Sequence, residues 1–449
     1  MSSFARWSWV SSGLLACGRA DAPVEDTDVG TSGIVVDASD ASGRAVDDGT
    51  TAADDDGDDD GPRPTKYDVG SPTGTLDCSD GEVTTAFSII WIANSPEGTV
   101  SKIDTGSAVE LARYRTGPDG PDPSRTAVNL AGDVAVSNRR GSITKIAGTL
   151  AGCIDADGDG EIRTSSGADD VLDWGADECV LWHASTSFDA SIAGSTGGPR
   201  ATAWTGGTLD PDTCAVTGVD LWVSWRNQPE SSATIRKISG VDGTTLGEAV
   251  IEDWPDNWGH GPYGGAADAA GDLWALGTSG SMFRVDGDDF SVERWDNAVS
   301  HVMYGIALDA AGDPWVAGYD GKLWNFDRTT AAWVDKGGTD GGPSRLRGLA
   351  VDAEGHAWVA GNGPCGLMRY DTLADELVDG HIELPGCATP VGVSVDADGM
   401  IWVVDRDAER AYRVDPDDYA VTTVEGLVQP YTYSDMTGAG LGLVVNPPG

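Results

Sequence analysis

An acidic loop at residues 153–162 has the residue types and the spacing of a cation site. It reads Cys-Ile-Asp-Ala-Asp-Gly-Asp-Gly-Glu-Ile, which puts carboxylates at Asp155, Asp157 and Asp159 and a glycine directly after the third. Hard carboxylate oxygens at alternate positions, followed by a glycine that permits a sharp turn, suit the flexible oxygen shell of Ca²⁺. The sequence therefore predicts a calcium site here. The predicted ligands are the carboxylates of Asp155, Asp157 and Asp159 and the backbone carbonyl of Glu161. One of Asp169, Asp170 and Asp173 would complete the set, and Asp170 is the candidate we choose.

The loop resembles the first eight positions of an EF-hand loop but not a complete EF-hand. Ser166 stands at the twelfth position, where that motif has glutamate, and the preceding segment reads as a strand. A calcium ion would order this loop rather than take part in catalysis, because extracellular loops of this kind bind calcium weakly and serve structure. The alternative is an acidic turn that binds no metal.

The N-terminus suggests where the protein resides. Residues 14–18 read Leu-Leu-Ala-Cys-Gly, which resembles a bacterial lipobox. The resemblance implies a signal peptide at residues 1–16, a lipidated Cys17 and, because Gly18 rather than aspartate follows, transfer to the outer membrane. Residues 17–76 contain few large apolar side chains and a run of aspartates at 54–60, which predicts a disordered acidic tether. A misassigned start codon and a free cysteine in a disordered tail remain alternatives.

Six further cysteines fit an exported protein with disulfide bonds. The short separations favour pairs between Cys153 and Cys179 and between Cys365 and Cys387, which would leave Cys78 with Cys214. The first pair would staple the acidic loop at its base. No Cys-x-x-Cys motif is present, so nothing in the spacing points to zinc or to thiol redox chemistry.

The elements that must position these residues belong to a repeat of about 43 residues. Residues 305–318 read GIALDAAGDPWVAG, and close copies begin at Gly264, Gly348 and Gly392. Each copy has a glycine, an alternating apolar run, an aspartate, a turn and a tryptophan strand, and further short strands follow. The tryptophan position of the repeat is held by Trp91, Ala135, Trp222, Trp274, Trp315, Trp358 and Trp402, the first three in diverged copies.

Short strands joined by Gly/Asp turns at this period predict four-stranded blades. Seven copies predict an all-β, seven-bladed β-propeller over residues 77–449, in which each tryptophan packs between neighbouring blades. The spacing of 87 residues between Ala135 and Trp222 is twice the period, which predicts a calcium-loop insertion at 147–185 after the second blade. The tail from Gln429 to Val445 is expected to add the strand that completes the first blade.

The repeat cadence, with G-x-[IL]-x-[RK]-[IVF]-D after it, resembles the seven-bladed propellers of the streptogramin (virginiamycin B) lyase group and their NHL-like relatives. The resemblance covers about residues 80–445 and implies the fold. Its lyase chemistry would require Pro-His-Gly or Pro-His-Ala steps and Trp-Phe-Thr-Glu strands around magnesium. Here residues 262–264 read Pro-Tyr-Gly, residues 303–305 read Met-Tyr-Gly and residues 274–277 read Trp-Ala-Leu-Gly. No catalytic residue is therefore assigned.

The positions before the blade glycines should ring one mouth of the central channel, where propellers usually bind ligands. Three of them are arginines, whose planar donors suit a carboxylate, sulfate or phosphate, and two are tyrosines, which could stack on a sugar or aromatic ring. The alternative is that each arginine pairs with an aspartate and fixes a loop. The predicted ligand-binding residues are Arg125, Arg200, Tyr263, Tyr304 and Arg347, with Val391 at the sixth position.

The charge composition excludes some classes of function. With 28 Lys+Arg against 73 Asp+Glu and a net charge of −45, the chain lacks the basic surface that nucleic-acid binding requires, and it would meet a membrane only through a lipid anchor. We expect a non-catalytic envelope lipoprotein that binds a protein, a glycan or a small anion. The alternative is a propeller lyase or hydrolase that uses His260 or His301 with a metal.

Overall fold

The computed structural model describes residues 88–192, 196–210, 215–228, 230–254, 259–279, 281–295 and 302–447, all of which belong to a compact unit from Thr65 to Gly449. The signal peptide at 1–16, the lipidated Cys17 and the tether at 17–76 lie outside the described residues. Cys78, Cys214 and His301 also lie outside them.

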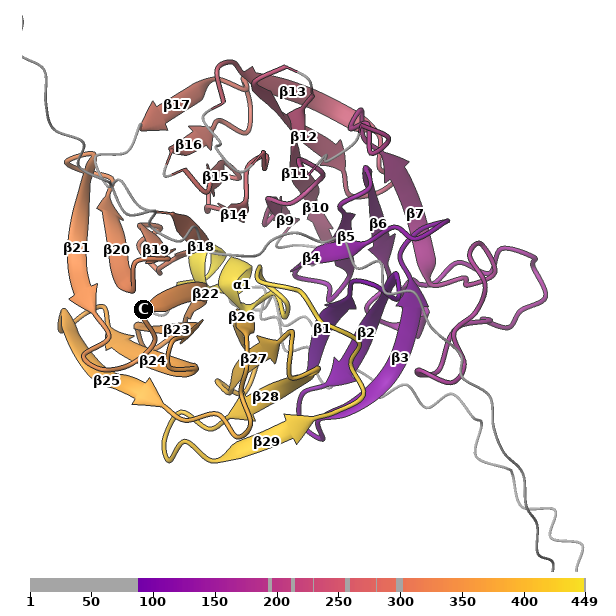
Figure 1. Cartoon of the computed structure of the whole chain (residues 1–449). Coiled ribbons are helices and arrows are strands. Elements are labelled where there is room, and N and C mark those ends of the chain that lie inside the picture. Colours follow the sequence, from indigo (N-terminus) through magenta and orange to yellow (C-terminus); the bar gives the residue numbers. More distant parts are fainter. Residues whose placement is uncertain are drawn as a thin grey trace, which may run out of the picture. The chain divides into compact units, whose positions relative to one another are not determined.

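Seven antiparallel sheets surround a central channel, which confirms the seven-bladed β-propeller (Figure 1). In each four-stranded blade the strands follow one another from the channel to the rim in sequence order. The blades comprise β1 (Ile89–Asn94), β2 (Thr99–Asp104) and β3 (Val109–Arg115); β4 (Pro123–Val128), β5 (Val134–Asn138), β6 (Ser142–Ile146) and β7 (Val180–Ser185); β8 (Thr202–Trp204), β11 (Asp220–Asn227), β12 (Ser232–Ser239) and β13 (Thr245–Ile251); β14 (Gly264–Ala267), β15 (Leu273–Leu276), β16 (Met282–Val285) and β17 (Val292–Trp295); β18 (Met303–Leu308), β19 (Pro314–Gly318), β20 (Lys322–Asp327) and β21 (Ala332–Gly338); β22 (Arg345–Val351), β23 (His356–Asn362), β24 (Gly366–Asp371) and β25 (Glu376–Ile382); and β26 (Pro390–Val395), β27 (Ile401–Asp405), β28 (Arg410–Val414) and β29 (Val421–Val424).

The aspartate and the tryptophan of the repeat form one hydrogen-bonded unit. In the fourth blade one Asp268 oxygen accepts from the indole Nε1 of Trp274 at 2.9 Å, and the other accepts from the backbone N–H of Ala270 and of Asp272 at 3.0 and 3.1 Å. The same indole bond recurs in the next three blades. A single carboxylate therefore fixes the turn and orients the ring, which explains the spacing in the sequence.

The tryptophans fill the space between blades, as predicted. Trp222 packs in one buried cluster with Leu273 and Phe283 of the following blade, and Trp358 packs with Val393 and Val403. Burying both faces of each sheet in this way supplies most of the hydrophobic stabilisation of a propeller.

The repeat glycines inside the innermost strands β18 and β22 are required by the close approach of neighbouring blades. A Cβ atom on Gly305 would lie 2.4 Å from the carbonyl oxygen of Arg347, and one on Gly348 would lie 2.6 Å from the Cα of Gly392. No side chain fits at these distances. The repeat glycine is thus a packing requirement of the channel wall.

The C-terminal segment runs along the inner edge of the first blade, but it forms there an isolated bridge between Asn94 and Pro430 rather than the expected fourth strand. The backbone N–H of Tyr431 donates to the carbonyl of Ala93 at 3.0 Å, and the N–H of Trp91 donates to the carbonyl of Met436 at 3.0 Å. The short helix α1 (Ala439–Val445), which the sequence analysis did not predict, follows at the centre of the ring in Figure 1. Its side chains Leu441, Leu443 and Val444 are buried.

The insertion predicted after the second blade lies inside that blade, which corrects its position. It connects β6 to β7 and begins with the short 3-10 helix η1 (Leu150–Gly152). A second insertion, the hairpin β9 (Thr208–Asp210) and β10 (Ala215–Thr217), lies between the first two strands of the third blade. The doubled spacing in the sequence thus has two sources, and β7 was missed because the insertion separates it from the rest of its repeat.

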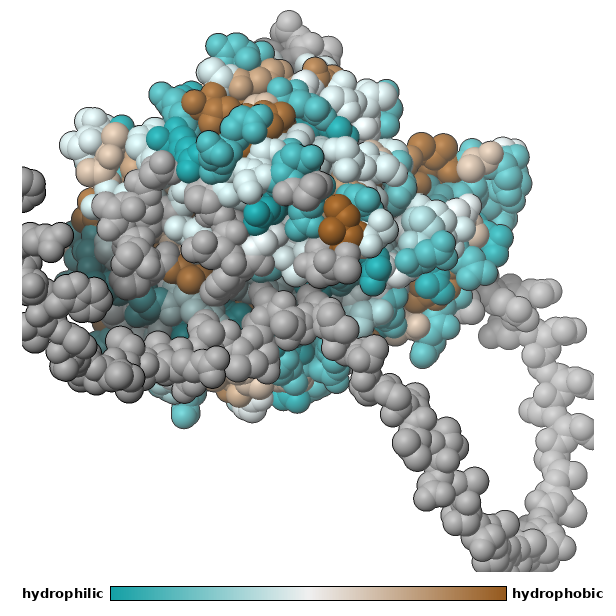
Figure 2. Space-filling view, turned by 45° about the horizontal axis from the view of Figure 1, so that its top comes forward, coloured by the Kyte–Doolittle hydropathy of each residue, from teal (hydrophilic) through white to brown (hydrophobic). Residues whose placement is uncertain are grey.

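The outer surface carries single apolar side chains rather than a continuous patch on the face seen in Figure 2. Val241 and Leu373 are the most exposed of them, and brown areas in the space-filling view are separated by hydrophilic residues. No helix within the described ranges is long and apolar enough to cross a membrane.

Candidate functional site

The five predicted ligand-binding residues come together at one mouth of the channel. Arg125, Tyr304 and Arg347 lie on the innermost strands β4, β18 and β22, Tyr263 directly precedes β14, and Arg200 lies two residues before β8. The guanidinium groups of Arg125 and Arg200 lie 4.9 and 5.1 Å from the ring centre of Tyr263. Tyr263 contacts the ring of Tyr304 at 5.1 Å, and Arg347 lies 5.3 Å from that ring.

Two tyrosines that the sequence analysis missed complete this group. Tyr431 and Tyr433 come from the segment that closes the first blade. The hydroxyl of Tyr431 lies 3.1 Å from that of Tyr263 and 2.5 Å from that of Tyr304, and the ring centre of Tyr433 lies 3.1 Å from the guanidinium carbon of Arg125. Their alternate spacing in Tyr-Thr-Tyr would have signalled a shared strand face. We call the seven residues the mouth cluster: Arg125, Arg200, Tyr263, Tyr304, Arg347, Tyr431 and Tyr433.

The mouth cluster is buried rather than open. Arg125, Arg200 and Arg347 are 1%, 3% and 6% exposed, and Tyr263 and Tyr304 are 0% and 1% exposed. The tyrosine faces that were expected to stack on a ligand ring instead contact guanidinium groups and one another. Cation–π contacts of this kind strengthen when the groups are removed from water. The tyrosines therefore line the site, and little space remains for a ligand larger than a small ion.

None of the three arginines forms a direct ion pair with a carboxylate of the described residues, although the charge of Arg347 helps to lower the pKa of Asp407. Arg125 donates to the carbonyls of Ser124 and Tyr263 at 2.8 and 3.4 Å, and Arg200 donates to a backbone carbonyl at 3.2 Å. Arg347 donates to tyrosine hydroxyls. The expected alternative, in which each arginine pairs with an aspartate, is thus wrong for these three. Their buried nitrogens without a hydrogen-bond partner are Nε of Arg125, Nε and Nη1 of Arg200, and Nε of Arg347.

The electrostatics reflect this excess of positive charge. Burial, together with the neighbouring charge of Arg200, lowers the pKa of Arg125 to about 9. Burial also opposes the charge on Arg347, but the hydroxyls of Tyr304 and Tyr319 outweigh it and raise its pKa. Both guanidinium groups remain charged at neutral pH. The mouth is therefore a positive site inside a strongly acidic protein.

His260, the candidate catalytic histidine within the described residues, lies beside the mouth cluster. Its ring centre is 5.2 Å from that of Tyr263, and its Nδ1 lies 3.1 Å from the carbonyl oxygen of Thr196. Burial, followed by the charge of Arg200, lowers the pKa of His260 to about 3. The imidazole is therefore neutral at pH 7 and adds no charge to the mouth.

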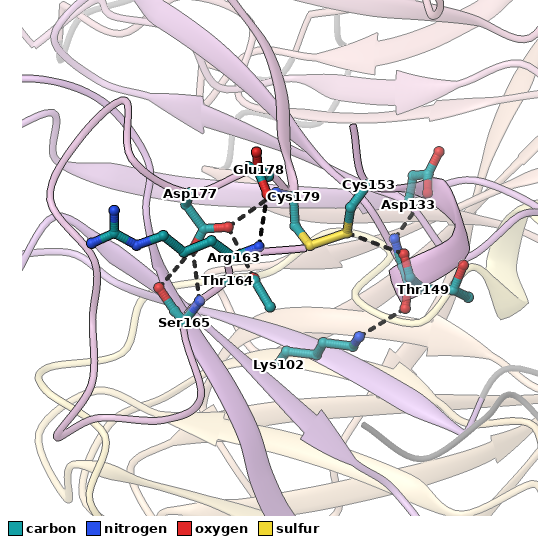
Figure 3. The surroundings of a disulfide bond; sticks show 11 residues. Lys102, Asp133, Thr149, Cys153, Arg163, Thr164, Ser165, Asp177, Glu178 and Cys179 are labelled. Carbon is teal, nitrogen blue, oxygen red and sulfur yellow. Dashed lines mark hydrogen bonds between the residues drawn. A yellow bond between two sulfur atoms is a disulfide. The ribbon is translucent and has the colours of Figure 1, made fainter. Parts of the chain in front are cut away.

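The acidic loop offers a compact set of carboxylates on the outside of the second blade. Carboxylate oxygens of Asp155, Asp157 and Glu178 lie within 4.8 Å of one another. Glu178 also accepts from the backbone N–H of Ala156 and of Arg163 at 2.8 and 2.7 Å, which ties the loop to its base (Figure 3). Carboxylate oxygens are the donor type that calcium prefers, and calcium takes six to eight oxygen ligands.

The predicted and observed members of this acidic group differ. Glu178 was missed, because it stands 23 residues after Asp155 in the sequence. Asp159 accepts from the backbone N–H of Glu161 at 2.8 Å and Asp170 accepts from the hydroxyl of Ser166 at 2.7 Å, and neither carboxylate belongs to the compact set. Calcium at this loop stays a prediction, and the structure adds Glu178 to the residues that would hold it.

Both disulfides favoured by the sequence form in the structure. Cys153 pairs with Cys179 at the base of the acidic loop (Figure 3). Cys365 pairs with Cys387 and joins the turn after β23 to the loop before β26. These bonds hold irregular segments against the blades and thereby limit the conformational freedom of the unfolded chain.

The fold and the site together define a seven-bladed β-propeller with a buried, basic channel mouth. No protein-family model matches the chain, and neither does any curated protein. Among solved structures, the chain is similar to virginiamycin B lyase from Staphylococcus aureus, with 12% identity, coverage of 72% of this chain and 94% of that chain, and a TM-score of 0.49. A streptogramin B lyase has 14% identity, coverage of 71% and 88%, and a TM-score of 0.49.

A third similar structure is apo AztD from Citrobacter koseri, with 12% identity, coverage of 77% of this chain and 96% of that chain, and a TM-score of 0.46. Identities at this level concern the fold alone. Function must be argued from the side chains of the site.

Proposed function

We propose that this propeller is a non-catalytic binding protein that holds a small anion at its channel mouth. The observation that carries the proposal is the set of three buried guanidinium groups, Arg125, Arg200 and Arg347, that lack a carboxylate partner. Burying a charge without a counter-charge is costly, and structural arginines are normally paired when they are buried. An external anion would supply the missing counter-charge.

The geometry favours a small anion over a glycan or a protein segment. The side chains of Tyr431 and Tyr433 already occupy the mouth and are 3% and 5% exposed. The neighbouring cavity of about 60 Å³, two residues further along the same strands, is lined by apolar side chains such as Ala127, Ile306 and Leu349, so an anion would bind at the arginines rather than inside it.

The proposal includes two features that come from the sequence. Lipidation at Cys17 would anchor the propeller to the outer membrane, on its periplasmic or its outer face. Calcium at Asp155, Asp157 and Glu178 would order the stapled loop of the second blade; its role would be structural.

The test is thermal unfolding of the full chain with sodium sulfate and with sodium chloride at equal ionic strength. Sulfate at 100 times its dissociation constant should add about 2.7 kcal/mol of stability. Arg200→Met should abolish this increase, whereas Arg115→Met, which removes an exposed arginine at the end of β3, should preserve it. Equal melting temperatures in the two salts, for sulfate and for carboxylate anions alike, would contradict the proposal.

A further inference from the structure

A cleft beside the insertion of the second blade has the size and the lining of a ligand site, and it shares no lining residue with the mouth cluster. Its volume is about 340 Å³, which lies in the range of small-molecule sites in proteins. One wall comes from the turn after β1 and the loop between β3 and β4, and the other comes from the insertion. The charged and aromatic side chains that line it are Glu97, Arg115, Asp119, Asp173 and Trp174.

The insertion and the second blade together hold Trp174 in place. The backbone N–H of Ala176 donates to the carbonyl of Asp173 at 3.0 Å and closes the turn that carries the indole. The indole ring lies 5.0 Å from the ring of His183, whose Nδ1 lies 2.8 Å from the hydroxyl of Thr144. Trp174 is half-buried, so part of it stays accessible at a fixed position in the cleft.

The opposite wall is rigid because a proline is locked between two glycines there. A Cβ atom on Gly98 or on Gly117 would lie 2.9 Å from a side-chain carbon of Pro121, so larger residues at these positions would displace the proline. Pro118 and Pro121 restrict the loop further, because the pyrrolidine ring fixes φ. A wall that is ordered in advance loses little conformational entropy when a ligand binds.

The polar side chains of the cleft are available to a ligand. Arg115, Asp119 and Asp173 are exposed, and their side chains form no hydrogen bond or ion pair with any other described residue. The indole N–H of Trp174 forms none either within the described part of the chain. The two carboxylates only accept hydrogen bonds, whereas the guanidinium and the indole only donate them. A ligand with several hydroxyl groups, which both donate and accept, matches this combination.

From this lining we infer that the cleft binds a pyranose sugar. The face of an indole ring carries negative charge density, which attracts the polarised C–H groups on one face of a sugar ring. The hydroxyl groups would then donate to Asp119 and Asp173 and accept from Arg115. The stapled insertion thereby gains a function, because it presents Trp174 to the ligand. This inference does not depend on the anion site.

Two other classes of ligand fit the cleft less well. An anion would meet two carboxylates and only one guanidinium group among the free side chains of the lining. A proline-rich peptide is bound by grooves lined with several aromatic rings, and Trp174 is the only aromatic residue among the described residues that line this cleft.

The experiment is saturation-transfer difference NMR of the full chain with maltose, cellobiose and N,N′-diacetylchitobiose. These probes carry no charge, so the arginines of the mouth cluster would not attract them. At least one should receive saturation on its ring protons. Trp174→Ala should weaken its binding at least about tenfold, whereas Trp174→Phe, which keeps an aromatic face, should weaken it less. The matched control is Trp333→Ala on β21, which removes another half-buried indole with one aromatic neighbour and should leave binding unchanged.

Two polar variants keep the test decisive if Trp174→Ala disturbs the insertion. Arg115→Met removes an exposed donor, and Asp119→Asn removes a charge while asparagine tolerates the φ of 46° at this position. Both should weaken sugar binding. Arg200→Met should bind the sugars as the wild-type protein does, which separates this test from that of the anion site.

Three results would overturn the inference. The first is that none of the three sugars receives saturation. The second is that a sugar binds equally well to wild-type protein, Trp174→Ala and Arg115→Met, which would place the sugar elsewhere on the protein. The third is that a proline-rich peptide, tested in parallel, receives saturation and no sugar does, which would assign the cleft to a peptide.

Discussion

Replacing Arg125 with methionine distinguishes an arginine that serves to bind an anion from an arginine that stabilises the fold. Arg125 is buried, and its pKa falls from 12.5 to about 9, which corresponds to about 5 kcal/mol of unfavourable free energy at neutral pH. This pKa already includes the favourable effect of the neighbouring tyrosines. The variant also loses two hydrogen bonds to carbonyls, which together are worth about 1–3 kcal/mol. Arg125→Met should therefore stabilise the anion-free protein by about 2–4 kcal/mol.

The matched control is Arg113→Met. Arg113 is equally buried, but it pairs with Glu97 at 3.1 Å and with Glu110 at 2.7 Å. Removing it leaves two half-buried carboxylates without a partner and should destabilise the protein by about 2–4 kcal/mol. Two buried arginines of one propeller should thus respond with opposite sign.

The assay is urea unfolding in a zwitterionic buffer, without and with sulfate. In sulfate the wild-type protein gains stability and the Arg125→Met variant does not, so the difference between them should vanish or reverse. A loss of several kcal/mol for Arg125→Met in the absence of anions, similar to the loss for Arg113→Met, would refute the argument. The arginine would then be a structural residue that its tyrosine neighbours satisfy.

Three further outcomes follow from individual contacts. Asp268→Asn keeps the turn bonds and loses only the indole acceptor, so it should cost about 1–3 kcal/mol, whereas Asp268→Ala should cost about 3–6 kcal/mol; equal melting temperatures for the two variants would contradict the shared role of this carboxylate. Burial and neighbouring arginines lower the pKa of His260 from 6.5 to about 3, so unfolding takes up a proton between these values and stability falls as the pH drops through this range; His260→Gln should flatten that slope in unfolding curves measured from pH 7 down to about pH 4. Calcium should protect the exposed Arg163 from cleavage by trypsin. Glu178→Gln should remove this protection, whereas Asp170→Asn should not. If Arg163 resists trypsin equally well in EDTA-treated, calcium-free protein, that result would count against a calcium site.

The sequence predicted the blades well because each repeat carries its own physical constraint. The aspartate needs an indole six residues later, and the entrance glycine, as at Gly305, needs the neighbouring backbone within van der Waals distance. The positions just before those glycines then follow from strand register. That is why five ligand-binding candidates could be placed in one cluster without a structure.

What the sequence did not predict depends on contacts between distant segments. Tyr431 and Tyr433 belong to no repeat, and they reach the mouth only because the tail closes the first blade. Glu178 meets Asp155 only because the chain folds back at the disulfide of Cys179. Periodicity carries no information about such pairings.

Crystals of the full chain grown in selenate provide the most direct test of the anion site. Selenate has the shape and charge of sulfate, and selenium gives an anomalous signal that identifies the ion. The account predicts an anomalous peak within hydrogen-bond distance of the free nitrogens of Arg200, together with contacts to Arg125 or Arg347. A mouth without that peak, in crystals that bind selenate elsewhere on the protein, would contradict it.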